Sequence, residues 1–424
     1  MMQLEKYKLG EIAFITKLAG FEHTKYIQGN CVHEKKDDNY IPLFIGKTIK
    51  DGKINPEFDW YISKDIADKL ERSQLKKKCI VLPYVGTLGD LAIFDGSYYA
   101  LLGSNVAKIE LEDNDLFTEE FIYYYLKSSA GQAVLLKDQQ GGVQKNITMD
   151  SIRNVEIPFF DKEHQLYITS VLSSLDRKIA LNRAINRNLE ALAKQIYDYW
   201  FVQFDFPDEN GKPYKSSGGK MVWNETLKRE IPIAWKSGAF SDIANITMGQ
   251  SPDGSSYNEK GEGIVFYQGS TDFGIRFPSV RMYTTSPSRY AKQGDILMSV
   301  RAPIGAVNIA NSDCCIGRGL SAINSKKGSI TYIYYVIHYL KVRFDSLNTA
   351  GTTFGSITKD ELFSLPVIIP SEKILERFEA ICKPIFNKQM EIGFEIESLT
   401  RQRDELLPLL MNGQLTVNSD LSAR

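Results

Sequence analysis

The chain has 424 residues and a formal net charge of −1, with 43% hydrophobic and 24% charged residues. These values are ordinary for a globular protein of two or three domains, and they exclude a global basic field without deciding whether a local basic patch exists. Five cysteines are too few for a disulfide framework in a chain of this length. The first residues lack the apolar run of a secretory signal, and no stretch approaches the ~20 apolar residues of a membrane span. We therefore expect a cytoplasmic protein with reduced thiols and no membrane partner.

Residues 1–160 are predicted to form a first β-rich domain. Compact apolar runs broken by glycine and proline, such as IPLFIGKTI and CIVLPYVGTLGDLAIF, are typical of strands. The segment FIYYYLKSSAGQAVLL at 121–136 favours a helix. A glycine-bearing loop, QQGGVQKNIT, then precedes a last strand that ends at Pro158.

Residues 161–202 predict one long helix, because the segment from Lys162 to Val202 contains neither proline nor glycine. Its apolar residues recur mostly at gaps of four and three, the signature of a helix with one apolar seam, and the rhythm slips near Asn182. The predicted seam consists of Ile168, Leu172, Leu175, Ile179, Leu189, Leu192 and Ile196. Near the end of the helix, the aromatic side chains exceed what a seam requires: Tyr197, Tyr199, Trp200 and Phe201.

The second half of the chain repeats this order of elements. A connector at 203–238, rich in Pro, Gly, Ser and charged residues, favours a small hairpin. We predict a second β-rich domain at 239–370, a second long helix at 371–415 and a tail at 416–424. The seam predicted for the second helix consists of Phe378, Ile381, Ile385, Ile392, Ile396, Leu399, Leu406 and Leu410.

Matched segments support a duplication of the whole domain-plus-helix module. GTTFGSITKDELFSLPVIIP answers GGVQKNITMDSIRNVEIPF, about 210 residues apart, which is far longer than a solenoid repeat. Each long helix has one unpaired apolar seam, so the economical arrangement packs the two seams together. The predicted fold class is α+β: two similar β-rich domains separated by a pair of long antiparallel helices, a coiled-coil spacer, with a pseudo-twofold internal repeat.

Signatures of catalysis and of metal binding fail when they are checked. Gly46-Lys47-Thr48 resembles the end of a phosphate loop but lacks its partner glycine, which would stand at Ile41. Cys31 and His33 have no second Cys/His pair to complete a zinc site, so no metal is expected. Gly-x-Ser-x-Gly and His-Glu-x-x-His are both absent. The pattern indicates a binding protein that is not an enzyme.

Three stretches resemble the specificity subunit of type I restriction-modification systems. They are GQSPDGSSYNEKGEGIVFYQGSTDFG, GDILMSVRAPIGAVNIANSDCCIGRGLSAI, and the run from KNIT through IPFFDKEHQ to LDRKIALNRAINRNLEAL. The resemblance covers nearly the whole chain and includes the order of recognition domain, helix, recognition domain, helix. The second copy matches better, because LPYVGTLG at Leu82–Gly89 replaces VRAPIG in the first copy.

The resemblance implies a subunit without a catalytic centre or a cofactor of its own. It would recognise a bipartite double-stranded DNA sequence, with one half-site per domain. It would assemble with two methyltransferase (modification) subunits, which bind S-adenosylmethionine, and with restriction subunits, which translocate using ATP and Mg. The four aromatic residues at the end of the first helix are predicted to dock a modification subunit or the opposite domain.

Cationic side chains are the candidate DNA contacts. In the second domain we select arginine, whose planar fork suits phosphate and guanine: Arg276, Arg281, Arg301 and Arg318. In the first domain the candidates are lysines: Lys47, Lys50, Lys53, Lys76, Lys77, Lys78 and Lys145. Surface solvation or structural pairing is the competing interpretation for each of them. A duplicated scaffold that binds other proteins is the alternative function.

Overall fold

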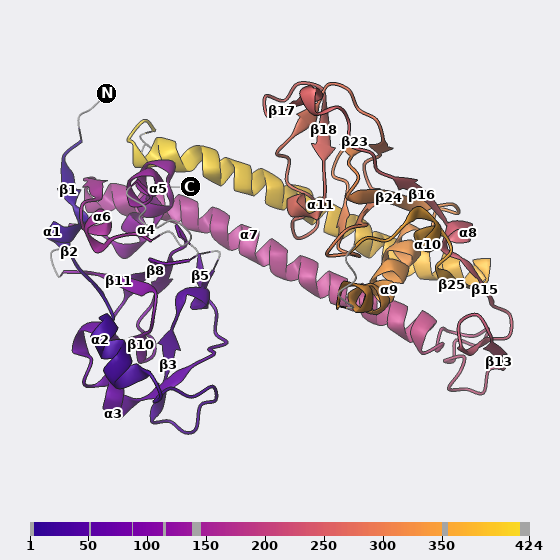
Figure 1. The fold of residues 1–424 in the computed structure, drawn as a ribbon, viewed down its shortest axis with the longest axis horizontal. Coiled ribbons are helices and arrows are strands. Elements are labelled where there is room, and N and C mark those ends of the chain that lie inside the picture. Colours follow the sequence, from indigo (N-terminus) through magenta and orange to yellow (C-terminus); the bar gives the residue numbers. More distant parts are fainter. Residues whose placement is uncertain are drawn as a thin grey trace, which may run out of the picture. The chain divides into compact units, whose positions relative to one another are not determined.

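The structure, a computed structural model, describes residues 4–50, 52–86, 88–112, 116–137, 146–349 and 355–415, without the side chains of 342–349. The chain divides into two compact units, Met1–Lys178 with Leu399–Arg424, and Ile179–Ser398. Both units are mixed α/β structures that share the two long helices (Figure 1). The unit boundaries therefore fall inside helices, whereas the predicted domain boundaries fall at their ends. The predicted tail, 416–424, lies outside the described residues.

The first unit is built on two four-stranded sheets. One sheet is antiparallel, with the order β2 (Ala13–Lys17), β11 (Val106–Leu111), β8 (Cys79–Pro83) and β9 (Ala92–Phe94). The other has the order β6 (Tyr61–Ser63), β3 (Tyr40–Phe44), β10 (Ala100–Leu102) and β7 (Gln74–Leu75), and in it only β3 and β10 are parallel. Two short antiparallel pairs complete the strands: β1 (Lys6–Lys8) with β12 (Glu156–Pro158), and β4 (Ile49–Lys50) with β5 (Lys53–Ile54).

Short helices connect these strands. They are α1 (Leu9–Ile12), α2 (Gly20–Glu22), a π-helical turn at His23–Ile27, 3₁₀ turns at Gly46–Thr48 and Glu71–Ser73, α3 (Lys64–Ala67), α4 (Glu119–Lys127), α5 (Ser129–Leu135) and α6 (Met149–Arg153). The single helix predicted over 121–136 is thus two helices that break at Ser128. The Ser128 hydroxyl accepts a hydrogen bond from the Gly131 N–H, and a Cβ at Gly131 would lie 2.2 Å from the Tyr125 carbonyl oxygen. A glycine at that position permits the sharp bend.

The second unit repeats the order of the main strands, with one additional edge strand in its second sheet. Its antiparallel sheet has the order β16 (Ala244–Met248), β24 (Leu320–Ser325), β21 (Ile296–Ser299) and β22 (Val307–Ile309). Its other sheet has the order β17 (Tyr257–Asn258), β19 (Tyr283–Thr284), β18 (Ile264–Tyr267), β23 (Cys314–Ile316) and β20 (Tyr290–Ala291), again with one parallel pair, β18 and β23. The pair of β15 (Lys236–Ala239) and β25 (Pro366–Ile369) matches β1 and β12. The duplication predicted from the sequence is therefore present in the sheet order.

The helices of the second unit also follow the first. They are α8 (Phe240–Ile243), 3₁₀ turns at Gly254–Ser256 and Ser270–Asp272, α9 (Ile330–Thr349) and α10 (Lys359–Phe363). The Ile-Thr dipeptide that the two matched segments share has the same structural role in both copies. Thr148 caps α6 and Thr358 caps α10, each through its hydroxyl.

The predicted connector is more than a linker. It contains the expected hairpin, β13 (Met221–Asn224) with β14 (Arg229–Pro232), but β15 begins at Lys236 and belongs to the second domain. Phe204, Phe206 and Trp235 are buried in the core of the second unit. The domain boundary at 238/239 is therefore corrected to the start of β15.

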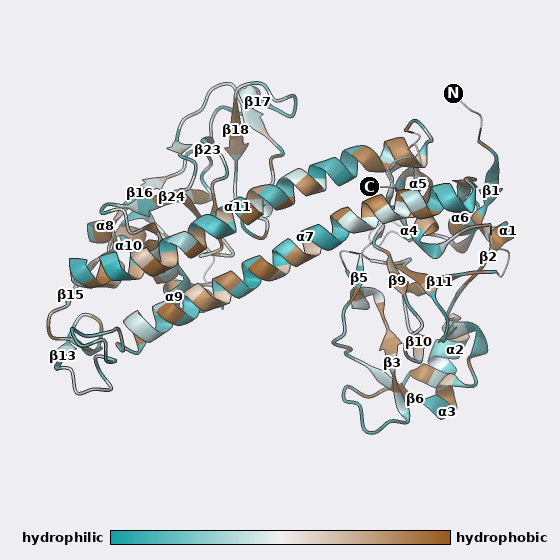
Figure 2. Cartoon of the chain, turned by 180° about the vertical axis from the view of Figure 1, so that it is seen from behind, coloured by the Kyte–Doolittle hydropathy of each residue, from teal (hydrophilic) through white to brown (hydrophobic). Residues whose placement is uncertain are grey.

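The two long helices are α7 (Lys162–Tyr197), which is extended by a π-helical turn at Asp198–Val202, and α11 (Glu372–Met411). Hydrophobic and hydrophilic residues alternate along both of them (Figure 2). In the first unit, Ile168 and Leu172 of α7 share a core with Leu407, Leu410 and Met411 of α11. In the second unit, the later part of α7 meets the earlier part of α11. The helices therefore run antiparallel within each unit.

The seam of α7 differs from the prediction after Ile179. Leu192 is 48% exposed, so its place in the predicted seam is wrong. The buried face continues instead through Asn182, Asn186, the half-buried Leu189 and Ala193, which keep the spacing of threes and fours without a slip. In α11, Ile381 is likewise exposed and Cys382 is buried in its place. The prediction missed the continuous heptad because it counted only apolar residues, whereas asparagines occupy two of the buried positions.

Most other predicted seam residues are buried or half-buried. Ile168, Leu172 and Ile179 of α7 are buried, as are Phe378, Ile392, Leu399 and Leu410 of α11. The half-buried members are Leu175, Leu189, Ile196, Ile385, Ile396 and Leu406.

Candidate nucleic-acid interface

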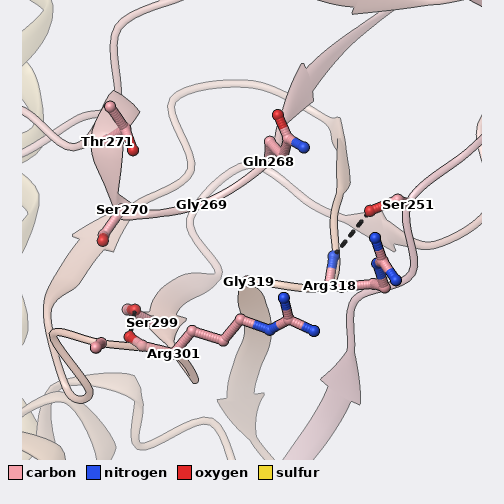
Figure 3. A pocket seen from close by; sticks show the side chains of 10 residues that line it. Ser251, Gln268, Gly269, Ser270, Thr271, Ser299, Arg301, Arg318 and Gly319 are labelled. Carbon is pink, nitrogen blue, oxygen red and sulfur yellow. Dashed lines mark hydrogen bonds between the residues drawn. The ribbon is translucent and has the colours of Figure 1, made fainter. Parts of the chain in front are cut away.

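The second unit has a polar cavity where β18 and β21 end and β23 passes into β24. Its volume is about 190 Å³, and its lining consists of Ser251, Gln268, Gly269, Ser270, Thr271, Ser299, Arg301, Ala302, Arg318 and Gly319 (Figure 3). No carboxylate is among these residues. The cavity therefore combines positive charge with hydroxyl and amide groups, which suits an anionic or hydrogen-bonding ligand.

Glycines allow the backbone segments around this cavity to approach closely. A Cβ on Gly249 would lie 2.1 Å from the Gly317 carbonyl oxygen, and a Cβ on Gly319 would lie 2.8 Å from the Gln268 carbonyl oxygen. The Gly317 N–H donates to the Tyr267 carbonyl at 2.8 Å. These glycines shape the cavity.

Arg301 and Arg318 supply the charge of the cavity. The isolated bridge between Arg301 and Ser356 and the bond from the Val300 N–H to the Gly319 carbonyl fix the backbone at both sites. The Arg301 side chain is extended, and its guanidinium points toward the segment that carries Arg318 (Figure 3). Both arginines are exposed, and neither has an acidic partner within the described part of the chain. Of the four predicted arginines, these two are brought together.

Arg281 is already engaged within its own domain. Its guanidinium forms an ion pair with Asp272, whose carboxylate is nearly buried, while the arginine side chain remains 60% exposed. This pairing offsets the charge of Arg281, which weakens the prediction that it contacts DNA.

Arg276 is buried, so the prediction of a DNA contact there is wrong. It donates to Glu190 of α7 at 3.2 Å, and its guanidinium lies over the rings of Phe386 and Tyr334, 4.7 and 5.2 Å from their centroids. Its neighbour Phe277 packs against Gly393, where a Cβ would lie 2.5 Å from the ring. Arg276 therefore anchors the second domain on the long helices.

The described candidate lysines of the first domain are exposed or half-buried, and several are paired. Lys47 pairs with Asp59, Lys76 with Asp68, and Lys78 with Glu119 and Glu120. Lys50 and Lys53 face each other across β4 and β5, and Lys77 is exposed. Only Lys47 lies in the 3₁₀ turn that matches Ser270–Asp272 at the cavity. Lys76, Lys77 and Lys78 precede β8, at the opposite end of that strand from the matching site, and Lys145 lies outside the described residues.

Sequence reasoning missed the uncharged part of the cavity. Gln268, Ser270 and Thr271 directly follow β18, and Ser251 follows β16. A polar run directly after a buried strand was the available signal, but selecting cations alone passed over it.

The aromatic residues at the end of α7 belong to the core of the second unit. Tyr197, Trp200 and Phe201 are buried, and Phe201 lies 4.8 Å from Tyr332 and 4.9 Å from Phe378, centroid to centroid. Of the two predicted roles, docking of a separate subunit does not fit these three buried residues, whereas packing against the second domain does: they hold α7 to α9 and α11. Tyr199, 38% exposed, is the one of the four that faces solvent.

Within the described residues, no group of three or more His, Cys, Asp or Glu side chains could hold a metal ion, and no helix is long and apolar enough to cross a membrane.

Comparison with known proteins gives the same family from several directions. The family model for the type I restriction modification DNA specificity domain matches residues 1–191 and 232–395. The chain belongs to this family. A putative type I restriction enzyme specificity subunit from Methanocaldococcus jannaschii is 29% identical and aligns with 92% of this chain and 91% of its own length. A second specificity subunit from that organism is 26% identical, over 72% of this chain and 70% of its own length.

The fold agrees with a solved structure of the family. The type I restriction-modification system S subunit from M. genitalium has a TM-score of 0.56 and 18% identity, and the match covers 97% of each chain. Specificity subunits are the non-catalytic, DNA-specifying members of type I systems, and this is the role of the chain. The three stretches that carried the resemblance thus led to the right family.

Proposed function

We propose that the chain reads a bipartite sequence in double-stranded DNA, with one half-site per recognition domain. The single observation that carries this proposal is the duplicated order of the main strands in the two domains, with an arginine-bearing polar cavity on the second copy. Two copies of one reader on a helical spacer convert the length of the spacer into the separation of two half-sites.

The catalytic steps belong to partner subunits in this proposal. Two methyltransferase subunits would bind S-adenosylmethionine and modify the DNA, and restriction subunits would use ATP and Mg. The complex would act in the cytoplasm, where cellular DNA is accessible. Membership of the family is what supports these partners.

Mapping of methylated bases tests the proposal directly. DNA from cells that carry the active modification subunits is sequenced with and without this gene. We expect one bipartite methylated motif to disappear when the gene is removed; an unchanged set of motifs would contradict the proposal.

A salt titration separates DNA reading from the scaffold alternative. Binding to DNA by the assembled complex should weaken steeply between about 50 and 200 mM salt, because phosphate contacts release counterions. If the chain were only a scaffold for other proteins, the complex would show no salt-dependent binding to DNA.

A further inference from the structure

The duplicated frame allows positions in the two recognition domains to be matched by hydrogen bonds. In the second domain, the Val300 N–H donates to the Gly319 carbonyl and the Ile357 N–H donates to the Val300 carbonyl, both at 2.9 Å. In the first domain, the Tyr84 N–H donates to the Asn105 carbonyl at 3.0 Å, and the Ile147 N–H donates to the Tyr84 carbonyl at 2.9 Å. Tyr84 therefore occupies the place of Val300.

The neighbouring positions follow from this match. The isolated bridge from Val85 to Asn146 corresponds to the bridge from Arg301 to Ser356. The Gly103 N–H donates to the Phe44 carbonyl at 2.7 Å, as the Gly317 N–H does to the Tyr267 carbonyl at 2.8 Å. Val85 thus matches Arg301, Ser104 matches Arg318 and Ile45 matches Gln268.

The side chains at these matched positions differ in chemistry between the two domains. The second domain presents two guanidinium groups and an amide, whereas the first presents an isopropyl group, a small hydroxyl and a branched apolar chain. The nearby cations of the first domain are also engaged: Lys17 lies over the Tyr84 ring, 4.3 Å from its centroid, and Lys47 pairs with Asp59.

The unlike side chains at matched positions favour a contact with bases over a contact with phosphates. The DNA backbone is the same at both half-sites, so a phosphate contact serves both copies of a duplicated reader equally. Bases differ between the half-sites, so a position that changes from guanidinium to isopropyl within a matched frame behaves as a base reader. Arginine forms its best base contact with the O6 and N7 atoms of guanine, whereas an apolar group suits the methyl group of thymine.

We propose that Arg301, with Arg318 beside it, reads a guanine in the second half-site, and that position 85/301 is a specificity-determining position in both domains. Among the described residues neither guanidinium group has an acidic partner, and no carboxylate lines the cavity, which keeps this site open to a guanine edge. This inference rests on the proposed function, because it assigns a base to one of the two half-sites.

The test is a selection of preferred sequences from a randomised DNA library by the specificity subunit assembled with its modification subunits. Wild type should select a bipartite motif with a guanine in one half-site. Arg301→Gln should lower the preference for that guanine about tenfold or more while the other half-site stays unchanged. Arg289→Gln, an exposed arginine outside the cavity, is the matched control.

A gain-of-function variant controls for the possibility that Arg301→Gln merely disrupts the folding of the domain. Val85→Arg should introduce a guanine preference at one position of the first half-site, with the second half-site unchanged. Uniform weakening of all sequences by Arg301→Gln, with a smaller salt slope, would show a phosphate contact and overturn the inference. So would a wild-type motif without guanine in the half-site that responds to Arg301. If wild type selects no bipartite motif at all, the proposed function itself fails.

Discussion

The long helices contact each other differently in the two units. In the first unit their shared core is apolar and includes Leu172 of α7 with Leu410 and Met411 of α11, and an ion pair joins Arg403 to Asp176 at 2.9 Å. In the second unit the middle of the pair has amides at the facing positions, whereas near the end of α7 the contacts are aromatic, as between Phe201 of α7 and Phe378 of α11.

The polar contacts between the helices of the second unit include one separate pair and a network around Gln389. Asn182 donates to Glu395 at 2.9 Å, and Asn186 and Gln389 each donate to the backbone carbonyl of the other at 3.4 Å. Gln389 also donates to Glu190 at 2.9 Å, and Glu190 accepts from Arg276.

The difference indicates a division of labour along one pair of helices. Apolar layers supply free energy but tolerate sliding, whereas buried polar residues at seam positions specify register at a cost in stability. The polar layer also receives Arg276 from the recognition domain, so in the second unit register and domain attachment depend on the same side chains.

The largest effect is expected from the apolar layer. Leu172→Ala should lower the free energy of unfolding of the first unit by about 2–5 kcal/mol, because a fully buried side chain leaves a cavity. Hydrogen exchange of amides in that unit measures the change. Leu166→Ala, on the same helix but 53% exposed, should cost less than about 0.5 kcal/mol.

Removing the anchor of the second domain should have the next largest effect. Arg276→Ala should cost the second unit about 2–3 kcal/mol, less than a fully buried pair because a third of the Glu190 side chain is exposed. The lost contacts with Phe386 and Tyr334 are included in that figure. Hydrogen exchange in α9 reports the loss, and protection equal to wild type would contradict the anchor.

Replacing the amide layer tests its role in register. The double variant Asn186→Leu with Gln389→Leu should change the stability of the second unit by no more than about 1 kcal/mol, because both amides are replaced by apolar groups of similar size. It should also increase self-association, measured by light scattering, since apolar seams accept more than one partner. A loss above about 2 kcal/mol without self-association would argue for a purely stabilising role.

The smallest expected effect depends on pH. Burial lowers the pKa of His338, and the neighbouring cations Lys341 and Arg276 act in the same direction while Glu190 opposes them. Below about pH 6.5 the unfolded chain therefore binds a proton that the folded unit does not, and the stability of the second unit falls as the pH falls. His338→Phe should flatten this dependence in denaturation midpoints measured from pH 7 to 5. An equally steep loss in the variant would assign the acid sensitivity to other groups.

The sequence was sufficient where one local pattern determined the structure. The repeated order of elements and the apolar parts of both seams follow from neighbouring residues. It failed where distant partners decide. No local signal separates Arg276, which lies on aromatic rings, from Arg301, which lies at a cavity, and Asn186 is recognised as a seam residue only when Gln389 faces it.

Each recognition domain is closed by a clasp, β1 with β12 in the first and β15 with β25 in the second. The first and last strands of each domain are therefore antiparallel neighbours, and the chain enters and leaves at one place. A different interior between the same two strands would preserve the entry into the long helix. Recombination at the clasps could thus exchange one domain as a cassette and create a new target sequence in a single genetic event, leaving the rest of the subunit intact.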